Sequence, residues 1–207
     1  GPQDGTSISN VRFNFAIYHA LDNLKEVKTD IRAYHWLGSI NATNHVLATY
    51  YTVPVKTFDD IKKTEVLIGE ASPRSDGTLL CNFFNAMLGT KIKVITGYGA
   101  MAKVKLAMER GEVQGVGDDG WAELKSNFPE MIAKHQINVL LQLGLERETD
   151  LPDVPLLSDL AKTPEQKAAF DFITKSIASM GKPFATSPGV PADRVAQFYD
   201  GVRDKGA

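Results

Sequence analysis

The chain has 207 residues, of which 43% are apolar, and its 23 Lys and Arg residues are interspersed with 25 Asp and Glu residues. This composition suffices for a globular core, and it shows neither the basic stripe that nucleic acid requires nor a basic amphipathic helix for a membrane surface. The apolar runs fall far short of the ~20 residues of a membrane span. The single Cys81 excludes an internal disulfide and a thiolate zinc site.

The first quarter of the chain is expected to contain short strands. A turn at Asp4-Gly5 precedes a strand candidate at Ser7–Phe13, and Ile17–Leu24 follows as a short helical or loop segment. Two further strands are expected at Tyr34–Ile40 and His45–Thr52. The opening residues Gly1 to Gly5 are typical of a loop that enters a strand, so we expect the chain to begin partway through a longer protein.

From residue 53 to residue 143, strand patterns alternate with helical patterns. The expected strands are Glu65–Gly69, Ile92–Ile95, Val113–Gly117 and Ile137–Leu143. The first expected helix begins near Thr57, which would be its N-cap residue. Three more are expected at Gly77–Leu88, Ala100–Arg110 and Gly120–Asn127. In the helix at Ala100–Arg110, the inner face is assigned to Met101, Val104, Leu106 and Met108. This alternation predicts an α/β fold with a parallel sheet and covering helices.

The remaining third of the chain contains two long helical patterns. A Pro-punctuated loop at Leu151–Pro155 precedes a helix at Pro164–Met180. A second loop at Pro183–Pro191 leads to a last helix that starts at Ala192 and looks cut off at Ala207.

Each of two neighbouring strands is followed by a turn and a helix, and the first turn combines hydroxyl groups with a guanidinium. Ser72 and Ser75 could donate hydrogen bonds to a carboxylate, and Arg74 could pair with the same group through two bonds. The simpler interpretation is a capped helix, with Ser75 or Asp76 as the N-cap and Arg74 in solvent. In parallel α/β sheets, ligands bind where such helix starts face the carboxyl ends of strands.

The second turn, Thr96–Ala100, allows two interpretations. Together with the next two residues it matches a relaxed dinucleotide fingerprint, G-x-G-x-x-A, and Asp118 and Asp119 follow the next strand as a ribose-binding carboxylate would. Alternatively, it is a tight turn in which Thr96, Gly99 and the adjacent backbone present N–H groups to a carboxylate, with Tyr98 beside the ligand.

No residue set in the sequence indicates catalysis or metal binding. The four histidines lack ligand spacing, Cys81 lies in a helical pattern as a buried inert thiol would, and no nucleophile elbow is present. Trp121 opens a helix after Asp118-Asp119-Gly120, where it is either a wall of a ligand cleft or part of the core. We therefore expect a binder of small anions, with no enzymatic activity, no cofactor and no metal.

Several segments together resemble the substrate-binding receptors of tripartite tricarboxylate transporters, the TctC or Bug family. Their order and spacing extend across nearly the whole chain. The matching segments are Pro54–Thr57, Leu88–Tyr98, Leu106–Gly115, Leu151–Pro155, Gly181–Phe184 and Pro188–Val195.

The resemblance implies a two-lobed fold of the type II periplasmic-binding-protein class, in which a carboxylate-bearing solute sits in the cleft between lobes. The solute would be delivered to a small and a large membrane subunit by a monomeric periplasmic receptor that does not insert into the membrane or bind nucleic acid. Carried over by position, the ligand-binding residues would be Ser72, Arg74, Ser75, Thr96, Tyr98, Gly99, Asp118 and Trp121, with Asn41 and Thr43 from the segment that approaches the first lobe crossing.

One departure from the family pattern is the absence of its opening strand and Pro/Gly-rich loop, which supply much of the other cleft wall. The expected division is therefore a partial first lobe at residues 1–52, a complete second lobe with the ligand half-site at 53–141, and a return segment at 142–207 that packs on the first lobe.

Two other functions remain open from sequence alone. The same two-lobed architecture serves as the ligand-sensing effector domain of cytoplasmic transcription regulators. A nucleotide-dependent enzyme built on the Gly97–Ala102 turn is the third alternative.

Overall fold

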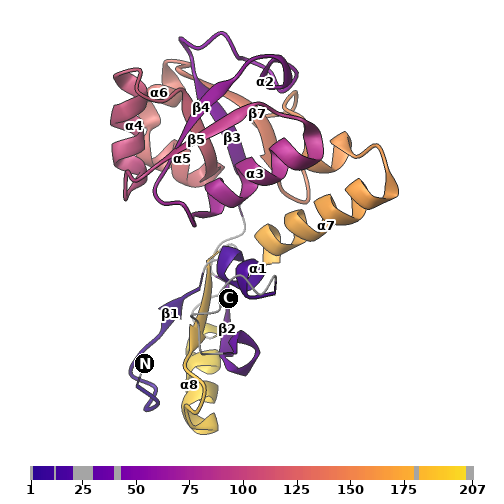
Figure 1. Cartoon of the computed structure of the whole chain (residues 1–207). Helices are drawn as coiled ribbons and strands as arrows, with labels where there is room; N and C mark the ends of the chain where they lie inside the picture. Colours follow the sequence, from indigo (N-terminus) through magenta and orange to yellow (C-terminus); the bar gives the residue numbers. More distant parts are fainter. Residues whose placement is uncertain (1, 12, 21–29, 40–42, 180–181, 204–207) are drawn as a thin grey trace. The chain divides into compact units, whose positions relative to one another are not determined.

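The computed structural model describes residues 2–11, 13–20, 30–39, 43–179 and 182–203. The chain forms two compact units, one from residues 1–42 with 179–207 and the other from residues 43–178 (Figure 1). We call them unit 1 and unit 2.

Unit 2 is built on a mixed five-stranded sheet in the order β5-β4-β6-β3-β7. Its strands are β3 (His45–Tyr50), β4 (Val66–Glu70), β5 (Ile92–Thr96), β6 (Gly115–Gly120) and β7 (Ile137–Leu143). Strand β4 runs parallel to β5 and β6, as expected, whereas β3 lies antiparallel between β6 and β7. The four strands expected in this sheet therefore all run in the same direction, and the unexpected feature is β3, which sequence alone assigns to the first lobe and which instead lies inside the sheet. The carboxyl ends of β4, β5, β6 and β7 and the amino end of β3 share one edge.

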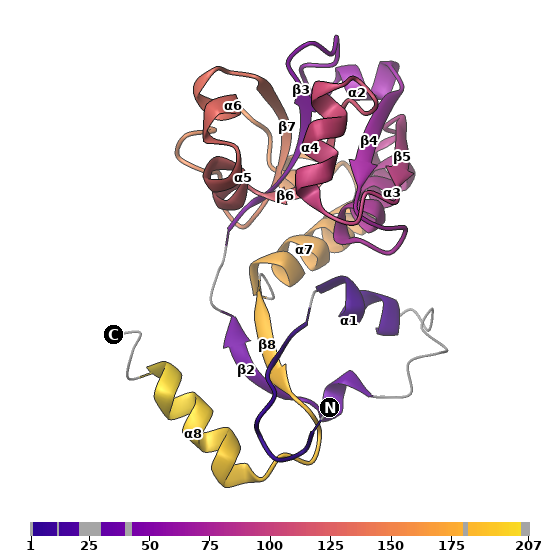
Figure 2. The ribbon, with the colours of Figure 1, turned by 90° about the vertical axis from the view of Figure 1, so that its left-hand side faces the viewer.

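Helices α3 (Asp76–Leu88) and α4 (Met101–Glu109) cover opposite faces of this sheet (Figure 2). Val116 of β6 packs in a cluster with Val104 and Met108 of α4. A Cβ atom at the next residue, Gly117, would lie 2.5 Å from Sγ of Cys81 on α3. Successive residues of a strand point to opposite faces of the sheet. Near Val116 and Gly117 of β6, one face is therefore covered by α4 and the other by α3.

Four further helices and one 3-10 turn complete unit 2. They are α2 (Asp60–Lys63), α5 (Trp121–Asn127), α6 (Pro129–Ala133), the turn η2 (Leu157–Leu160) and α7 (Pro164–Ser179). Helix α2 starts later than expected, because Thr57 donates its hydroxyl to the Asp60 carboxylate and Asp59 takes the N-cap position. Leu106 of α4 is 49% exposed, so its assignment to the inner face is wrong.

Helix α7 extends unit 2 beyond the expected boundaries. The Phe170 ring lies edge-on to Phe83 of α3, with centroids 5.8 Å apart, and Gln166 Nε2 donates to the Met87 carbonyl at 2.9 Å. At the other end, β3 pairs with both β6 and β7. The compact unit therefore spans 43–178 rather than 53–141, and residues 142–178 of the expected return segment pack within it.

Unit 1 contains a small antiparallel sheet in the order β1-β8-β2. Its elements are β1 (Ser9–Asn10), α1 (Phe13–Ala20), the 3-10 turn η1 (Ile31–Ala33), β2 (His35–Ser39), β8 (Pro183–Thr186) and α8 (Ala192–Arg203). The expected strand at residues 7–13 is reduced to β1, and β8 lies within the segment expected to be a loop. Leu37, Val190 and Val195 form a buried cluster. Among the described residues, no helix is both long and apolar enough to cross a membrane.

Candidate functional site

The two turns singled out in the sequence meet at the carboxyl edge of the unit 2 sheet. Strands β4 and β5 are parallel neighbours in which Glu70 is paired with Thr96, so the turns that follow them begin side by side. The backbone N–H of Gly99 donates to the Ala71 carbonyl at 2.9 Å and links the turns directly. Gly97 and Gly99 have φ of 107° and 74°, which other residues rarely adopt.

The first turn is capped by side chains of its own. Ser75 is the N-cap of α3, and its Oγ accepts from the Thr78 N–H at 3.3 Å. The same Oγ donates to Oε2 of Glu70 at 2.9 Å, whereas Ser72 and Arg74 lie on the surface. The capped-helix interpretation therefore accounts for Ser75, and Ser72 and Arg74 remain the exposed polar groups of this turn.

The second turn leads into a helix with no side-chain cap. The N-cap of α4 is Ala100, so the N–H groups of Met101 and Ala102 have no acceptor within the helix. Thr96, Gly97 and Gly99 are exposed, whereas Tyr98 is half-buried against the apolar cluster beneath α4. The start of α4 is thus the more open of the two positions for an anion.

An irregularity of β6 places Asp118 against His45. Paired residues step from Val46 to Ala48 on β3 but from Asp119 to Val116 on β6, so β6 carries one extra residue there. A bulge of this kind re-aims a side chain. Here it brings Oδ1 of Asp118 within 2.5 Å of Nδ1 of His45. Burial lowers the pKa of His45, but the Asp118 carboxylate, together with Asp76 and Asp119, outweighs this, and the net shift is upward.

Glu70 is a buried acid beneath the two turns that sequence reasoning missed. It is 2% exposed, and its Oε1 accepts from the Gly117 N–H at 3.1 Å. Burial, reinforced by the Asp118 carboxylate, raises the pKa of Glu70 to about 7, against the hydrogen bonds from Ser75 and Gly117 that lower it. The one available signal was a charged residue directly after a buried strand, the position at which functional groups of parallel sheets gather.

Asp119 is a second acid at this edge with a raised pKa. Burial, with the neighbouring Asp118 carboxylate, raises the pKa of Asp119 to about 7. In the part of the chain that the structure describes, its buried Oδ2 has no hydrogen-bond partner. A buried carboxyl oxygen without a hydrogen-bond partner favours the neutral form of the acid.

Of three other predicted site residues, two make contacts within the protein and one lies outside the described residues. Trp121 is 5% exposed, packs in the core with Val46, and donates from Nε1 to Asp150 at 2.9 Å. We therefore correct its assignment from ligand-binding to core. The Thr43 hydroxyl accepts from the Ala122 N–H in the first turn of α5 at 3.3 Å, and Asn41 lies outside the described residues.

Cys81 is fully buried, and burial raises the pKa of its thiol well above the ordinary value, as expected of an inert thiol. Within the described ranges, no group of three or more His, Cys, Asp or Glu side chains could hold a metal ion.

We predict that the buried acids make unit 2 more stable in mild acid than in mild base. The pKa of Glu70 is higher in the folded state than its ordinary value of 4.5, so its contribution is complete below pH 4.5 and is lost as the pH rises to about 7. For Glu70 alone this amounts to on the order of 3 kcal/mol. Urea unfolding at several pH values measures the decline, which should be smaller in Glu70→Gln.

The matched control for this prediction is Glu112→Gln, which removes an exposed carboxyl. It should keep the wild-type pH profile of the unfolding free energy. An identical profile in Glu70→Gln and wild type would show that Glu70 does not titrate in this range.

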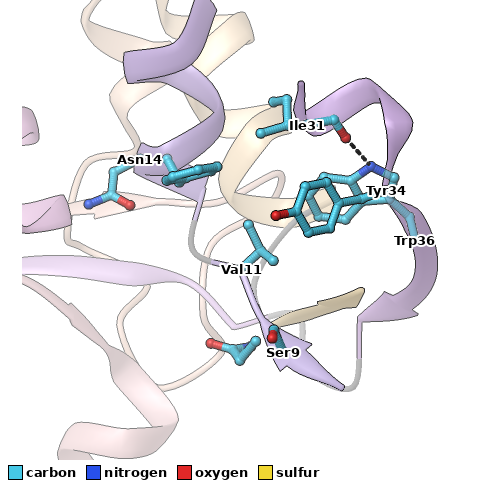
Figure 3. A pocket seen from close by; sticks show the side chains of 8 residues that line it. Ser9, Val11, Asn14, Ile31, Tyr34 and Trp36 are labelled. Carbon is cyan, nitrogen blue, oxygen red and sulfur yellow. Dashed lines mark hydrogen bonds between the residues drawn. The ribbon is translucent and has the colours of Figure 1, made fainter. Parts of the chain in front are cut away.

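Unit 1 contains a separate cavity of about 320 Å³ (Figure 3). The aromatic side chains of Tyr34 and Trp36 form one wall, and Trp36 Nε1 donates to the Ile31 carbonyl at 3.3 Å. The lining residues are Ser9, Asn10, Val11, Asn14, Phe15, Ile31, Tyr34 and Trp36. None of these side chains carries a charge.

Comparison with known proteins gives structural neighbours only. No protein-family model and no curated protein matches the chain. MatC from Rhodopseudomonas palustris with bound malate superposes with a TM-score of 0.71 at 14% identity, over 99% of this chain and 66% of its own. The periplasmic binding protein BugD superposes with a TM-score of 0.69 at 15% identity, over 96% of this chain and 62% of its own. A TctC solute-binding protein from Polaromonas superposes with a TM-score of 0.63 at 14% identity, over 99% of this chain and 65% of its own.

The chain has the fold of TctC and Bug periplasmic binding proteins. This confirms the expected fold class, a mixed α/β architecture of the type II periplasmic binding class. The chain spans less than two thirds of the length of each of these three neighbours. At this level of identity, the TctC and Bug fold is what the comparison establishes, and the ligand belongs to the proposal below.

Proposed function

We propose that this chain is part of an extracytoplasmic solute receptor that captures a small organic carboxylate and delivers it to the membrane subunits of a tripartite tricarboxylate-type transporter. The observation that carries the proposal is the pair of linked turns at the sheet edge, of which the second opens an uncapped helix. Backbone N–H groups at a helix start, together with the helix dipole, favour a carboxylate.

The neighbours support the same ligand class. One of them, with a TM-score of 0.71, holds malate, and the fold is that of periplasmic solute receptors. In such receptors, ligand binding shifts an equilibrium between open and closed states, and the closed state is the one a membrane partner would recognise. We propose residues 1–52 as part of the other lobe and Ser72, Arg74, Thr96, Gly99 and the start of α4 as the half-site of unit 2.

The geometry does not favour a dinucleotide-binding enzyme. In the dinucleotide fold, the acidic residue follows the strand beside the one that carries the Gly-rich turn. Here β4 lies between β5, which carries the turn, and β6, which carries Asp118. The Asp118 side chain is 4% exposed and paired with His45, so it is not available to a ribose.

A calorimetric screen tests the proposed ligand class. We expect heat of binding from di- and tricarboxylates such as malate and citrate, and none from sugars. A response to sugars or amino acids with a flat response to every organic acid would refute the carboxylate assignment. The coding sequence upstream of Gly1 separates the receptor from a transcription regulator, because a signal peptide favours the first and a helix-turn-helix the second.

A further inference from the structure

The start of α3 already holds a carboxyl group that belongs to the protein. Glu70 is fixed through both oxygens, with Oε2 accepting from Ser75 Oγ at 2.9 Å and Oε1 from the Gly117 N–H at 3.1 Å. A Cβ atom on Gly77, in the first turn of α3, would lie 1.9 Å from Oε1. The carboxyl therefore presses against the backbone of that turn, and an ionised Glu70 places a negative charge beneath the position proposed for a ligand anion.

The hydrogen-bond network around Glu70 is compatible with two proton arrangements. The Ser75 hydroxyl has one proton but three partners, namely Glu70 Oε2 at 2.9 Å, the Ser72 carbonyl at 2.9 Å and Thr78 Oγ1 at 3.0 Å. With Glu70 ionised, that proton belongs to the carboxylate. With Glu70 protonated, its own O–H donates to Ser75 Oγ, and the Ser75 proton passes to the Ser72 carbonyl. The same heavy-atom positions serve both states.

The charges that face Glu70 come from α3 and β6, whereas its partner residue on β5, Thr96, is uncharged. Asp76 lies on α3, and Asp118 on β6, where it is paired with His45 of β3. The Cys81 thiol on α3 is neutral because burial raises its pKa well above the ordinary value. The carboxylates oppose a further negative charge, so an anion added at this edge favours protonation of Glu70.

We propose that Glu70 couples anion capture at the sheet edge to the uptake of a proton. Ionised Glu70 repels a carboxylate at the starts of α3 and α4, and protonation removes this repulsion while the Glu70 carboxyl keeps its position. This inference rests on the proposed function and adds a regulation to it: the receptor would load in mildly acidic surroundings and release its ligand more readily as the pH rises. By linkage, the ligand raises the proton affinity of Glu70 by the same factor by which the proton raises the ligand affinity, so the pKa of Glu70 rises by the logarithm of that factor.

The test is malate binding to the whole chain from about pH 6 to pH 8.5, measured by calorimetry in two buffers of different ionisation enthalpy. We expect the wild type to take up protons on binding and to lose affinity by about tenfold per pH unit above pH 7. Glu70→Gln keeps both contacts, since its amide oxygen accepts from Gly117 and its amide N–H donates to Ser75. It should bind at all pH values as the wild type does at low pH.

The Asp119→Asn variant is the matched control, because Asp119 has a pKa of about 7 as well. It should retain the pH dependence. Loss of the pH dependence in Asp119→Asn but not in Glu70→Gln would overturn the assignment to Glu70. Malate binding without proton uptake by the wild type would overturn the inference and leave the proposed function intact. Failure of every organic acid to bind at any pH would overturn both.

Discussion

Replacing Gly115 with Ala is expected to lower the free energy of unfolding of unit 2 by about 3 kcal/mol or more. A Cβ atom at this position would lie 2.2 Å from the Ala48 carbonyl oxygen, 2.9 Å from Cδ1 of Ile68 and 3.0 Å from Cα of Thr49. Two of these atoms belong to the β3 backbone, which is held between β6 and β7 and cannot withdraw. Chemical denaturation, followed by far-UV circular dichroism, measures the loss.

The same substitution is expected to affect the site, because Gly115 pairs with Thr49 next to the bulge that brings Asp118 to His45. The control is Gly201→Ala in α8, where a Cβ atom meets nothing within 4 Å. Ala is a better helix former than Gly, so this control should be neutral or slightly stabilising. Equal stability of the Gly115→Ala variant and the wild type would contradict the close approach of β3 and β6.

Ala100→Asp is expected to raise stability and abolish tight ligand binding together. Ala100 is the N-cap of α4, with extended backbone angles and no side-chain hydrogen bond. An Asp side chain there accepts from the first-turn N–H groups and adds about 1 kcal/mol to the free energy of unfolding. The Asp carboxylate then accepts the hydrogen bonds that the same N–H groups are proposed to donate to the ligand, so affinity for a dicarboxylate should fall by about 10- to 100-fold.

Two variants separate the causes of that effect. Ala100→Ser supplies a neutral cap, so stability should rise and affinity should fall less than with Asp. Ala168→Asp adds the same charge to an exposed position of α7 and should leave affinity unchanged. If Ala100→Asp were to bind malate as tightly as the wild type, the ligand would have to lie elsewhere than at the start of α4.

Periodicity and capping residues were enough to predict the elements that frame the site. The apolar spacing of α3 and α4 and the runs of β4 and β5 come from local sequence, and the structure places each within one or two residues of its expected bounds. The expected end of α3 at Leu88 is confirmed, and the next residue, Gly89, ends the helix with a left-handed backbone, at φ of 68°. These features depend on residues within a few positions of each other, which is why sequence alone predicts them.

Features set by distant partners could not be predicted. Strand β8 looks like a loop because Pro and Gly surround it, and it becomes a strand by pairing with β1 and β2. Strand β3 takes its antiparallel position in the sheet by pairing with β6 and β7, which lie far along the chain. A tryptophan at position 121 could line a cleft, but its Nε1 donates to Asp150, 29 residues further along the chain, and this contact helps to hold it in the core.

The same reason explains why Glu70 was missed. Its burial depends on a hydrogen bond from the Gly117 N–H, which lies 47 residues further along the chain. It also depends on the missing side chain of Gly77, because a Cβ atom there would lie 1.9 Å from Oε1 of Glu70. Local sequence shows one acid after four residues of a strand, which is an ordinary pattern. The acids that shape the electrostatics of the edge are therefore visible only once β4, β6 and α3 are packed together.

The most direct measurement is an NMR titration of the ¹⁵N-labelled chain with malate, followed through the backbone amide signals. The largest shifts should fall on Met101 and Ala102 at the start of α4, with smaller ones on Asp76 and Gly77 at the start of α3. Shifts confined to the cavity around Tyr34 and Trp36, or no shift at any amide of the two turns with malate in excess, would contradict an anion held where these two helices begin.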